Sequence, residues 1–350
     1  MAAGGSGGLL IYAYLLFAMP ALSATPADRD ACAASADKPD VGGAACSRII
    51  DDASEPVAER VKAYNNRGVA YYSLHDYDAA LADHAEAIRL DAGDKWAYAR
   101  RGMAWMEKGE FDRAVTDITE AVTIDPKYAF GFGQRGQALF RKRLITKKGG
   151  WEPAIADYSE AIRLDPNLLW LYSSRGVAYS NNRQYDLAIP DCSEVIKREP
   201  DNPGGYNCRG VAYEGLKDYR RAIADYDQSI SINPRNGVAY WNRGNAYMAL
   251  RRVDDAIRDY DQAIAINPKD FNAFNSRGKA WVAKGDSNRA VADFTQAIQF
   301  GPSYVEAYNN RGLSHEVLGH RAEAIADFRK AQSIDPADPI SKQQLRVLGF

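Results

Sequence analysis

The chain has 350 residues, of which 46% are apolar and 26% charged, and its formal net charge is −2. This length is sufficient for a substantial buried core, and the near-neutral charge gives no indication of nucleic-acid binding. The 21 tyrosines disfavour a disordered chain, and no stretch reaches the roughly 18 to 20 apolar residues of a membrane-spanning helix.

The N-terminus carries an apolar run of 14 residues, LLIYAYLLFAMPAL at 9–22, which is followed by the small residues SATPAD. This pattern is typical of a secretory signal peptide, which we assign to 1–24 with cleavage near Ser23 or Ala24. The preceding MAAGGSGG contains no Lys or Arg, and an uncleaved anchor or a stray apolar tail is the alternative. We therefore predict a periplasmic or secreted protein with no membrane span after signal removal.

Export would place the four cysteines in an oxidising compartment, where disulfides form. Cys32 and Cys46 lie in the segment 25–60, which we expect to form a partial helical cap stapled by a bridge between them. Cys192 and Cys208 fall on consecutive predicted helices, and the sequence leaves open whether they are bridged. No CxxC pair or Cys/His cluster indicates a metal site, and we expect no cofactor.

Arg-Gly pairs divide the rest of the chain into regular units. They recur at intervals of 34 residues, except for one interval of 40. The pairs stand at 67–68, 101–102, 135–136, 175–176, 209–210, 243–244, 277–278 and 311–312. An aromatic residue precedes every one of these glycines by four positions, and a proline stands near the end of every unit except the first.

The spacing within one unit predicts two helices packed against each other. An aromatic, a Gly and usually an aromatic at i, i+4 and i+7 share one helix face, and the second half places Ala, usually an aromatic, and often Ala at the same spacing. Glycine inside a helix costs about 1 kcal/mol, so its recurrence indicates another backbone pressed close. Each hairpin keeps one apolar face that only a neighbouring unit can cover.

This period and signature resemble the tetratricopeptide repeat over about residues 61–336. The resemblance implies an all-α, right-handed superhelical solenoid of eight helix-turn-helix repeats, whose first helices line a concave groove. We assign the repeats to 61–94, 95–128, 129–168, 169–202, 203–236, 237–270, 271–304 and 305–338. The stretch 42–52 resembles a degenerate second helix, and 339–350 is expected to form a C-terminal capping helix.

Every repeat has Arg before its glycine, where the family usually has a large apolar residue. An aspartate keeps step in each second helix, at 83, 117, 157, 191, 225, 259, 293 and 327. Both charges fall on predicted interior positions, where an unpaired charge is costly. We expect ion pairs in at least six units, such as Arg67 with Asp83 and Arg243 with Asp259, with the aspartate of the same or of the preceding hairpin. The alternative is a row of arginines that binds an anionic ligand.

Two short stretches match catalytic motifs only in part. GFGQRG at 131–136 fits a dinucleotide-binding fingerprint, but it follows no predicted strand and lies inside a predicted helix. HEVLGH at 315–320 resembles a zinc-protease motif, but its histidines are five residues apart and off a common face. We predict no catalytic residues, and hence no enzyme.

The third repeat has six additional residues within FRKRLITKKGGWEP at 140–153. We expect a basic surface loop here, formed by Arg141, Lys142, Arg143, Lys147 and Lys148. It is either a tolerated insertion or a docking site for an anionic partner or membrane surface.

Positions two and three before each glycine, and one and four after it, are expected to face the groove. Amide side chains at such positions can bind an extended peptide backbone without selecting its sequence, and they resemble the asparagine ladder in the tetratricopeptide superhelix of O-GlcNAc transferases. Trp and Met side chains would add selectivity. The candidates are Asn65, Asn66, Trp96, Arg100, Met103, Asn207, Trp241, Asn242, Asn245, Asn275, Asn309 and Asn310. A solvated polar face is the alternative.

Taken with the resemblance, these patterns predict a non-catalytic scaffold or adaptor that binds partner peptides or proteins in its concave groove. One alternative is an accessory subunit of a cell-envelope biosynthesis or secreted enzyme system. Another is a structural protein that associates with itself through its ends.

Overall fold

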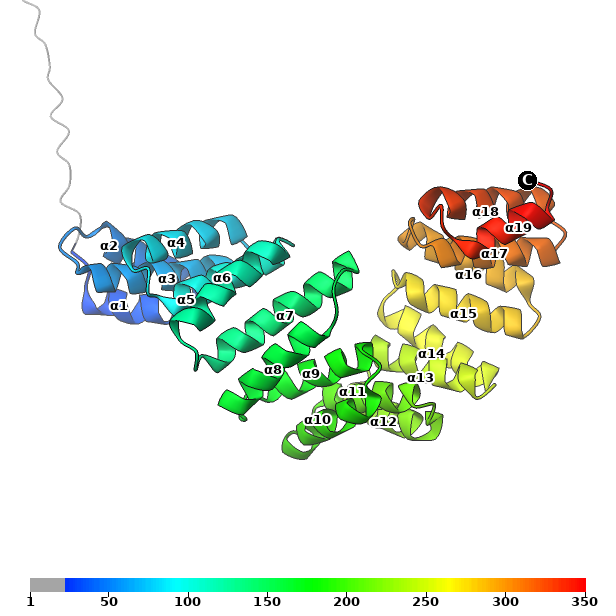
Figure 1. Cartoon of the computed structure of the whole chain (residues 1–350), viewed down its shortest axis with the longest axis horizontal. Helices are drawn as coiled ribbons and strands as arrows, with labels where there is room; N and C mark the ends of the chain where they lie inside the picture. Colours follow the sequence, from blue (N-terminus) through cyan, green and yellow to red (C-terminus); the bar gives the residue numbers. More distant parts are fainter. Residues whose placement is uncertain (1–22) are drawn as a thin grey trace, which may run out of the picture. The chain divides into compact units, whose positions relative to one another are not determined.

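The computed structural model describes residues 23–350, so the assigned signal peptide lies outside the described residues except for its last two positions (Figure 1). The described residues form 19 α-helices and no strand. Their bounds are α1 Pro26–Ala33, α2 Pro39–Asp51, α3 Val57–Ser73, α4 Tyr77–Leu90, α5 Lys95–Glu107, α6 Phe111–Ile124, α7 Ala129–Thr146, α8 Glu152–Leu164, α9 Leu169–Asn181, α10 Tyr185–Arg198, α11 Pro203–Gly215, α12 Tyr219–Ile232, α13 Gly237–Ala249, α14 Val253–Ile266, α15 Phe271–Ala283, α16 Ser287–Phe300, α17 Val305–Val317, α18 Arg321–Ile334 and α19 Pro339–Val347. Among residues 23–350, none of these helices has the length and apolar character needed to cross a membrane.

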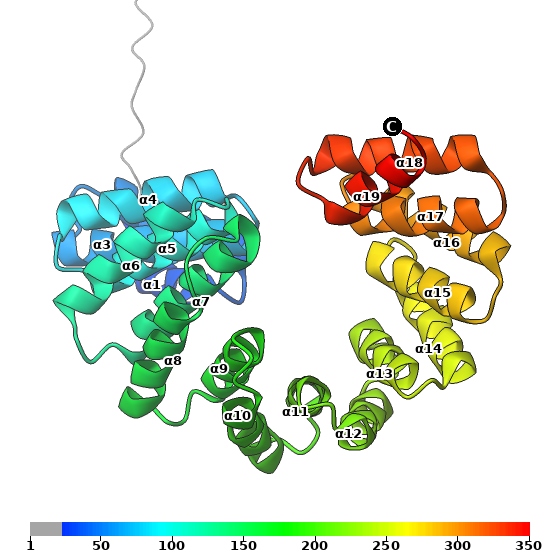
Figure 2. The same ribbon diagram turned by 45° about the vertical axis from the view of Figure 1, so that its right-hand side comes forward.

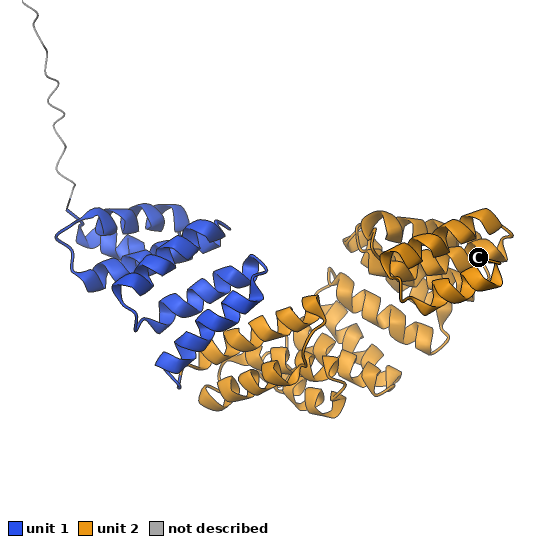
Figure 3. Cartoon of the chain, turned by 45° about the horizontal axis from the view of Figure 1, so that its top comes forward, with its two compact units in different colours: residues 1–127 blue, residues 128–350 orange. Residues whose placement is uncertain are grey.

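The chain divides into two compact units, Met1–Lys127 and Tyr128–Phe350 (Figure 3). Helices α3 to α18 pack in consecutive pairs, α3 against α4 through to α17 against α18, and within each unit one pair packs against the next (Figure 2). We call the odd-numbered member of each pair the first helix and the even-numbered member the second helix. Helices α1 and α2 form a further pair that packs on α3, and α19 packs on α18. The predicted all-α fold of helix hairpins is confirmed.

Short polar side chains begin many of the first helices. The Asp94 carboxylate accepts hydrogen bonds from the backbone N–H groups of Trp96 and Ala97, at 2.9 and 3.2 Å. Asp270 caps α15 in the same way, through Asn272 and Ala273. These caps satisfy N–H groups that have no partner inside the helix.

The repeat glycine allows the two helices of a hairpin to approach closely. A Cβ added to Gly244 of α13 would lie 2.6 Å from Cε1 of Tyr260 in α14. The Tyr260 ring is buried, and its hydroxyl donates to Asn245 Oδ1 at 2.8 Å. Gly210 and Tyr226 repeat the arrangement in α11 and α12, also at 2.6 Å. The glycine is therefore required by the ring opposite it.

All eight repeat arginines bond the aspartate of their own hairpin. Arg243 is representative: its Nε and Nη2 donate to the two carboxylate oxygens of Asp259, at 2.8 and 2.7 Å. These hydrogen bonds raise the pKa of Arg243, and its guanidinium lies 5.5 Å from the centre of the Tyr240 ring. The row of arginines is thus neutralised within each repeat and is not offered to an anionic ligand.

The remaining guanidinium nitrogen reaches the preceding hairpin. Arg209 Nη1 donates to Ser193 Oγ at 3.3 Å, whereas Arg243 Nη1 donates to the carboxylate of Asp227 at 2.5 Å. Equivalent bonds are made by Arg67, Arg175, Arg277 and Arg311. One side chain therefore closes its own hairpin and also ties it to its neighbour.

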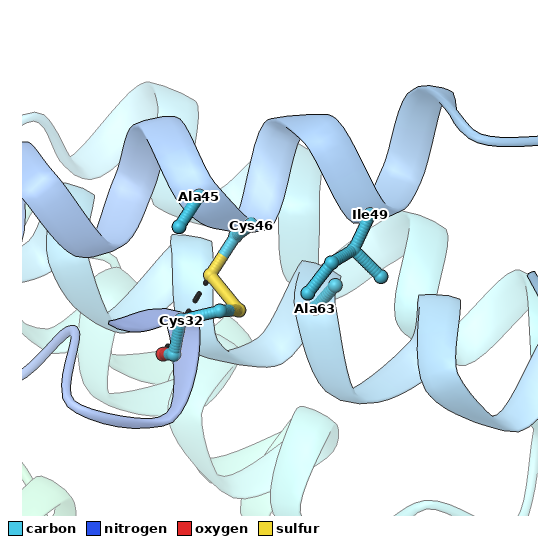
Figure 4. Close-up of a cluster of buried hydrophobic side chains, with 5 residues drawn as sticks. All are labelled: Cys32, Ala45, Cys46, Ile49 and Ala63. Atoms are coloured by element: carbon cyan, nitrogen blue, oxygen red, sulfur yellow. Dashed lines mark hydrogen bonds between the residues drawn. A yellow bond between two sulfur atoms is a disulfide. The ribbon is translucent and has the colours of Figure 1, made fainter. Parts of the chain in front are cut away.

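Both pairs of cysteines are bridged. Cys32–Cys46 joins α1 to α2, within a small cluster that includes Ile49 (Figure 4). Cys192–Cys208 joins α10 to α11, and its sulfurs pack where a Cβ of Gly176 would otherwise lie. Cys192 thus occupies the position that an aromatic ring fills in five of the other repeats, including Tyr158, Tyr226 and Tyr260.

Replacing Cys192 and Cys208 together by serine is expected to lower the free energy of unfolding by about 3 kcal/mol, because the bridge closes a loop on the order of 16 residues in the unfolded chain. Urea unfolding followed by circular dichroism measures this change, and mass spectrometry of the parent establishes that the bridge is formed. An unchanged urea midpoint in the double variant would show that the bridge contributes nothing to stability.

Candidate functional site

A pocket of about 410 Å³ lies on the first helices of the second unit. Helices α9, α11 and α13 lie side by side there, because α11 contacts both of the others (Figure 2). The pocket is lined by Asn181 of α9, Glu214 of α11, and Trp241 and Asn245 of α13. Two tyrosines that open second helices, Tyr185 of α10 and Tyr219 of α12, complete the wall.

Backbone and side-chain contacts fix the aromatic wall of this pocket. The Tyr185 ring lies so close to Gly215 that a Cβ there would have no room. The indole N–H of Trp241 donates to Ser276 Oγ of α15 at 2.9 Å. Trp241 and Asn245 are one helical turn apart, so they share a face of α13. Tyr185 and Trp241 are therefore each held in place by the repeat that follows them.

Glu214 is the only acidic residue that lines the pocket. Its Oε2 accepts a hydrogen bond from the Tyr226 hydroxyl at 2.8 Å. Burial raises the pKa of this carboxyl, and the bond from Tyr226 opposes the rise. The carboxylate lies among aromatic rings and amides in a partly desolvated place.

Four of the asparagines predicted to line the groove stand three positions before a repeat glycine, and three of them, Asn65, Asn275 and Asn309, are buried, whereas Asn207 is partly exposed. Asn275 and Asn309 are 2% and 1% exposed. Asn309 donates to Asp338 Oδ2 at 2.9 Å, and Asn65 donates to Asp94 Oδ2 at 2.5 Å. Their amides bind the start of the next helix pair, and the expectation that they bind a partner is wrong for these three residues. The position follows the packing aromatic directly and faces the next repeat.

The other predicted groove residues fall into two places. Asn242 lines the pocket beside Trp241 and Asn245, although its own amide is buried and donates to Asn207 Oδ1 at 3.0 Å. Asn310 donates to Asn275 Oδ1 at 3.0 Å, and therefore supports that buried side chain. The remaining four lie in the first unit and take no part in this pocket: Asn66, Trp96, Arg100 and Met103.

Three residues of the pocket were missed from the sequence. Glu214 stands four residues after Gly210, at one of the positions expected to face the groove, but a carboxylate there has no distinguishing pattern among many surface charges. Tyr185 and Tyr219 each open a second helix. Their approach to the pocket depends on how consecutive hairpins pack, which the periodicity of one unit does not specify.

The insertion in the third repeat lengthens a helix instead of forming one basic loop. Helix α7 extends to Thr146, so Arg141, Lys142 and Arg143 are helical and only Lys147 and Lys148 lie in the connection. The Arg143 guanidinium lies 5.0 Å from the centre of the Trp151 ring. The five-residue basic loop is therefore wrong as a single element.

The two partial motifs do not form catalytic sites. GFGQRG lies inside α7. His315 and His320 do meet, with 3.3 Å between their Nδ1 atoms, because Gly319 turns the chain back with a φ of 78°. In the described part of the chain, no group of three or more His, Cys, Asp or Glu side chains is arranged to hold a metal ion.

Comparison with known proteins finds the same repeat along most of the chain. Models of the tetratricopeptide repeat match residues 61–94, 97–128, 171–202, 204–236 and 305–338, and a TPR repeat model matches 144–182 and 244–285. A search of curated protein sequences finds no match.

Several solved structures are similar. A tetratricopeptide repeat protein from Parabacteroides merdae ATCC 43184 superposes with a TM-score of 0.61 and 17% identity, over 73% of this chain and 98% of that one. MamA has 25% identity and a TM-score of 0.43, over 46% of this chain and 94% of its own. YrrB, described as a TPR protein with an unusual peptide-binding site, has 18% identity and a TM-score of 0.44, over 55% and 97%. The first of these likenesses shows the fold alone.

Proposed function

Because the chain belongs to the tetratricopeptide repeat family of protein-interaction scaffolds, we propose that it is a non-catalytic scaffold that binds a partner peptide or protein at the pocket of α9, α11 and α13. The observation that carries the proposal is this pocket of about 410 Å³, which has a fixed aromatic wall and a few polar groups. Ligand sites usually combine such features, with volumes of roughly 300 to 1,000 Å³.

Trp241 is the expected anchor of the interaction. Tryptophan is enriched among residues that dominate binding energy, particularly where neighbouring contacts exclude water. Its ring is held by the bond to Ser276, so little side-chain entropy is lost when a partner packs on it. The amides of Asn181 and Asn245 lie at the same pocket and can bond a peptide backbone.

Replacing Trp241 by alanine is expected to weaken partner binding by about 2 kcal/mol or more, the usual cost of removing an interface anchor. The partner is first recovered by co-purification with the parent chain, and its affinity is then measured by calorimetry. Trp96→Ala is the matched control, because Trp96 is 48% exposed and lies in the first unit. Retained affinity in the Trp241 variant, after circular dichroism has shown an intact fold, would contradict the proposal.

The two alternative functions, self-association and an accessory subunit, predict different results with the same purified protein. A self-associating structural protein would show a concentration-dependent mass in sedimentation experiments without any partner. An accessory subunit would co-purify with a separate catalytic chain, and the Trp241 substitution would release that chain. The pocket is lined by residues between Ser180 and Ala249 and by none of the end helices, which favours partner binding over end-to-end assembly.

We also propose that the protein is exported. The two disulfides support an oxidising compartment. The backbone N–H of Ala24 donates to Asp52 Oδ2 at 2.9 Å, and hydrogen bonds from Ser54 and Ala24 lower the pKa of Asp52. Cleavage between Ser23 and Ala24 would convert this N–H into an ammonium group beside a carboxylate that is already ionised.

Mass spectrometry of the protein from fractionated cells tests the export proposal. The mature chain is expected to begin at Ala24, with cleavage one residue before the assigned end of the signal peptide because of the Ala24–Asp52 contact, and to occur outside the cytosol. A chain that retains Met1 and stays in the cytosolic fraction would contradict both the cleavage and the compartment.

A further inference from the structure

Glu214 is partly buried and, unlike the eight repeat aspartates, has no cationic partner in the described residues. Each of the eight repeat aspartates binds an arginine through both oxygens, as Asp225 does with Arg209. Glu214 forms no ion pair within residues 23–350, and only the neutral hydroxyl of Tyr226 bonds it. A partly buried carboxylate without a cation is unfavourable, and a bound cation would compensate it.

Two arginines near the starts of α12 and α14 are engaged elsewhere. Arg221 bonds Asp218 and lies 4.5 Å from the centre of the Tyr213 ring. Arg252 bonds Asp255 in the same way and lies over Tyr247. Neither residue lines the pocket. Among the described residues, no Lys or Arg lines the pocket, and none forms an ion pair with Glu214.

Aromatic rings line the same pocket as the carboxylate. Tyr185, Tyr219 and Trp241 line the same pocket, and the faces of such rings attract cations, most strongly in the case of tryptophan. Asn181 donates its amide nitrogen to the Val177 carbonyl at 2.9 Å, which leaves its Oδ1 as a further acceptor at the pocket. Rings, a carboxylate and an amide oxygen together fit an organic cation.

The hydrogen bond from Tyr226 decides which cation fits best. It takes one of the two acceptor sites of Glu214 Oε2, so Oε1 is the oxygen with both acceptor sites free. A guanidinium gains most from two parallel bonds to a carboxylate, as in the eight arginine–aspartate pairs, whereas an ammonium is a compact charge that one oxygen can serve. We infer that the pocket binds the ammonium group of a partner's lysine side chain, with Glu214 as the counter-ion and Trp241, Tyr185 and Tyr219 as its aromatic wall.

This inference rests on the proposed function, because it names the group that the partner inserts into the same pocket. It also predicts how the affinity of the pocket for a lysine side chain changes with pH. An ammonium requires ionised Glu214, so lysine binding weakens as the pH falls through the raised pKa of this carboxyl. Binding that relied on the rings alone would not respond in this way.

The test uses the full mature chain and three capped peptides that alternate alanine with lysine, arginine or acetyl-lysine. Calorimetry is expected to show at least tenfold tighter binding of the lysine peptide than of the acetyl-lysine peptide. Glu214→Gln keeps the shape of the side chain and is expected to abolish this preference. Glu120→Gln, an exposed change in the first unit, is expected to leave it unchanged. Equal binding of the lysine and acetyl-lysine peptides, or of the lysine and arginine peptides, would overturn the inference.

The two variants separate failure of the inference from failure of the proposed function. If Trp241→Ala weakens binding of the co-purified partner while Glu214→Gln does not, the scaffold site stands and the lysine inference fails. If neither variant changes partner binding, the proposed site itself is wrong. If both weaken it and the lysine peptide competes with the partner, both proposals are supported.

Discussion

Replacing Asp225 by asparagine is expected to lower the free energy of unfolding by about 3 to 5 kcal/mol, the usual cost of removing one partner of a buried ion pair. The Asp225 side chain is 9% exposed, and it bonds Arg209 at 2.9 and 2.8 Å. Asparagine keeps the size of the side chain but loses its charge. The amide oxygen of the new side chain can accept only one of the two bonds, and the other acceptor of Arg209 is the neutral Ser193 hydroxyl, at 3.3 Å.

Asp259→Asn in the next repeat is the matched control. Arg243 would lose the same carboxylate but would keep Asp227, which is bonded at 2.5 Å. A smaller loss of stability is therefore expected from the same chemical change. Urea unfolding of both variants measures this difference. Equal losses of stability would show that the bond to the preceding hairpin does not contribute to the free energy of unfolding.

Joint replacement of Arg209 by Met and of Asp225 by Leu is expected to restore most of the stability lost in the Asp225 variant. Buried ion pairs exchanged for apolar residues of similar volume are often neutral or stabilising, because no charge is left to desolvate. A joint variant as unstable as Asp225→Asn would mean that the pair itself, and not the uncompensated charge, determines the loss.

Replacing His84 by phenylalanine is expected to remove most of the acid sensitivity of the first unit. Burial and the nearby Arg100 and Arg101 lower the pKa of His84 from 6.5 to about 3. Below pH 6.5 the unfolded chain therefore takes up a proton that the folded chain does not. The parent is expected to lose about 4 kcal/mol of stability between pH 7 and 3.5 through this residue, and nothing above pH 7.

The fold tolerates this exchange because His84 occupies the place of an aromatic ring. Its Cε1 would lie 2.6 Å from a Cβ on Gly68, as the Tyr226 ring does opposite Gly210. Within residues 23–350, the one hydrogen-bond contact of the His84 ring is between its Nδ1 and Asn65 Oδ1, at 3.1 Å. Thermal unfolding at a series of pH values compares the parent with the variant.

His75→Asn is the control for the pH experiment. His75 is exposed in a turn with a φ of 61°, which asparagine adopts readily. Its removal is expected to leave the pH profile of the parent unchanged. Parallel profiles for the parent and His84→Phe would show that His84 is already charged or already exposed in the folded chain.

The fold followed from the sequence because its determinants recur at a fixed interval. Each glycine, such as Gly244, stands opposite a ring such as Tyr260, and this local geometry repeats with the period. The sequence could not show which aspartate each arginine binds, because its own hairpin and the preceding hairpin both contain a possible acceptor. In the structure the arginine uses both, with its own aspartate taking two of the three bonds that Arg243 makes.

The candidate site was less accessible to sequence reasoning. Trp241, Asn242 and Asn245 were predicted to face the groove, and the structure places all three in the lining of one pocket. Asn275 and Asn309 do not line it, because the same spacing also serves contacts with the next repeat. Which side of a first helix stays exposed depends on how far each hairpin is rotated relative to the one before it. No repeating pattern in the sequence reports this rotation.

The placement of both charges within one hairpin has a consequence for how such a chain can change in length. Arg209 and Asp225 are separated by 16 residues, so any duplication or deletion of a whole 34-residue segment carries the two charges together. A recombination event therefore adds or removes an electrically neutral block, and no buried charge is stranded at the junction. Only the weaker bond to the preceding hairpin must be remade, and its acceptor already varies between serine, threonine and aspartate. The ion pair that stabilises each repeat therefore also allows whole repeats to be gained or lost by recombination.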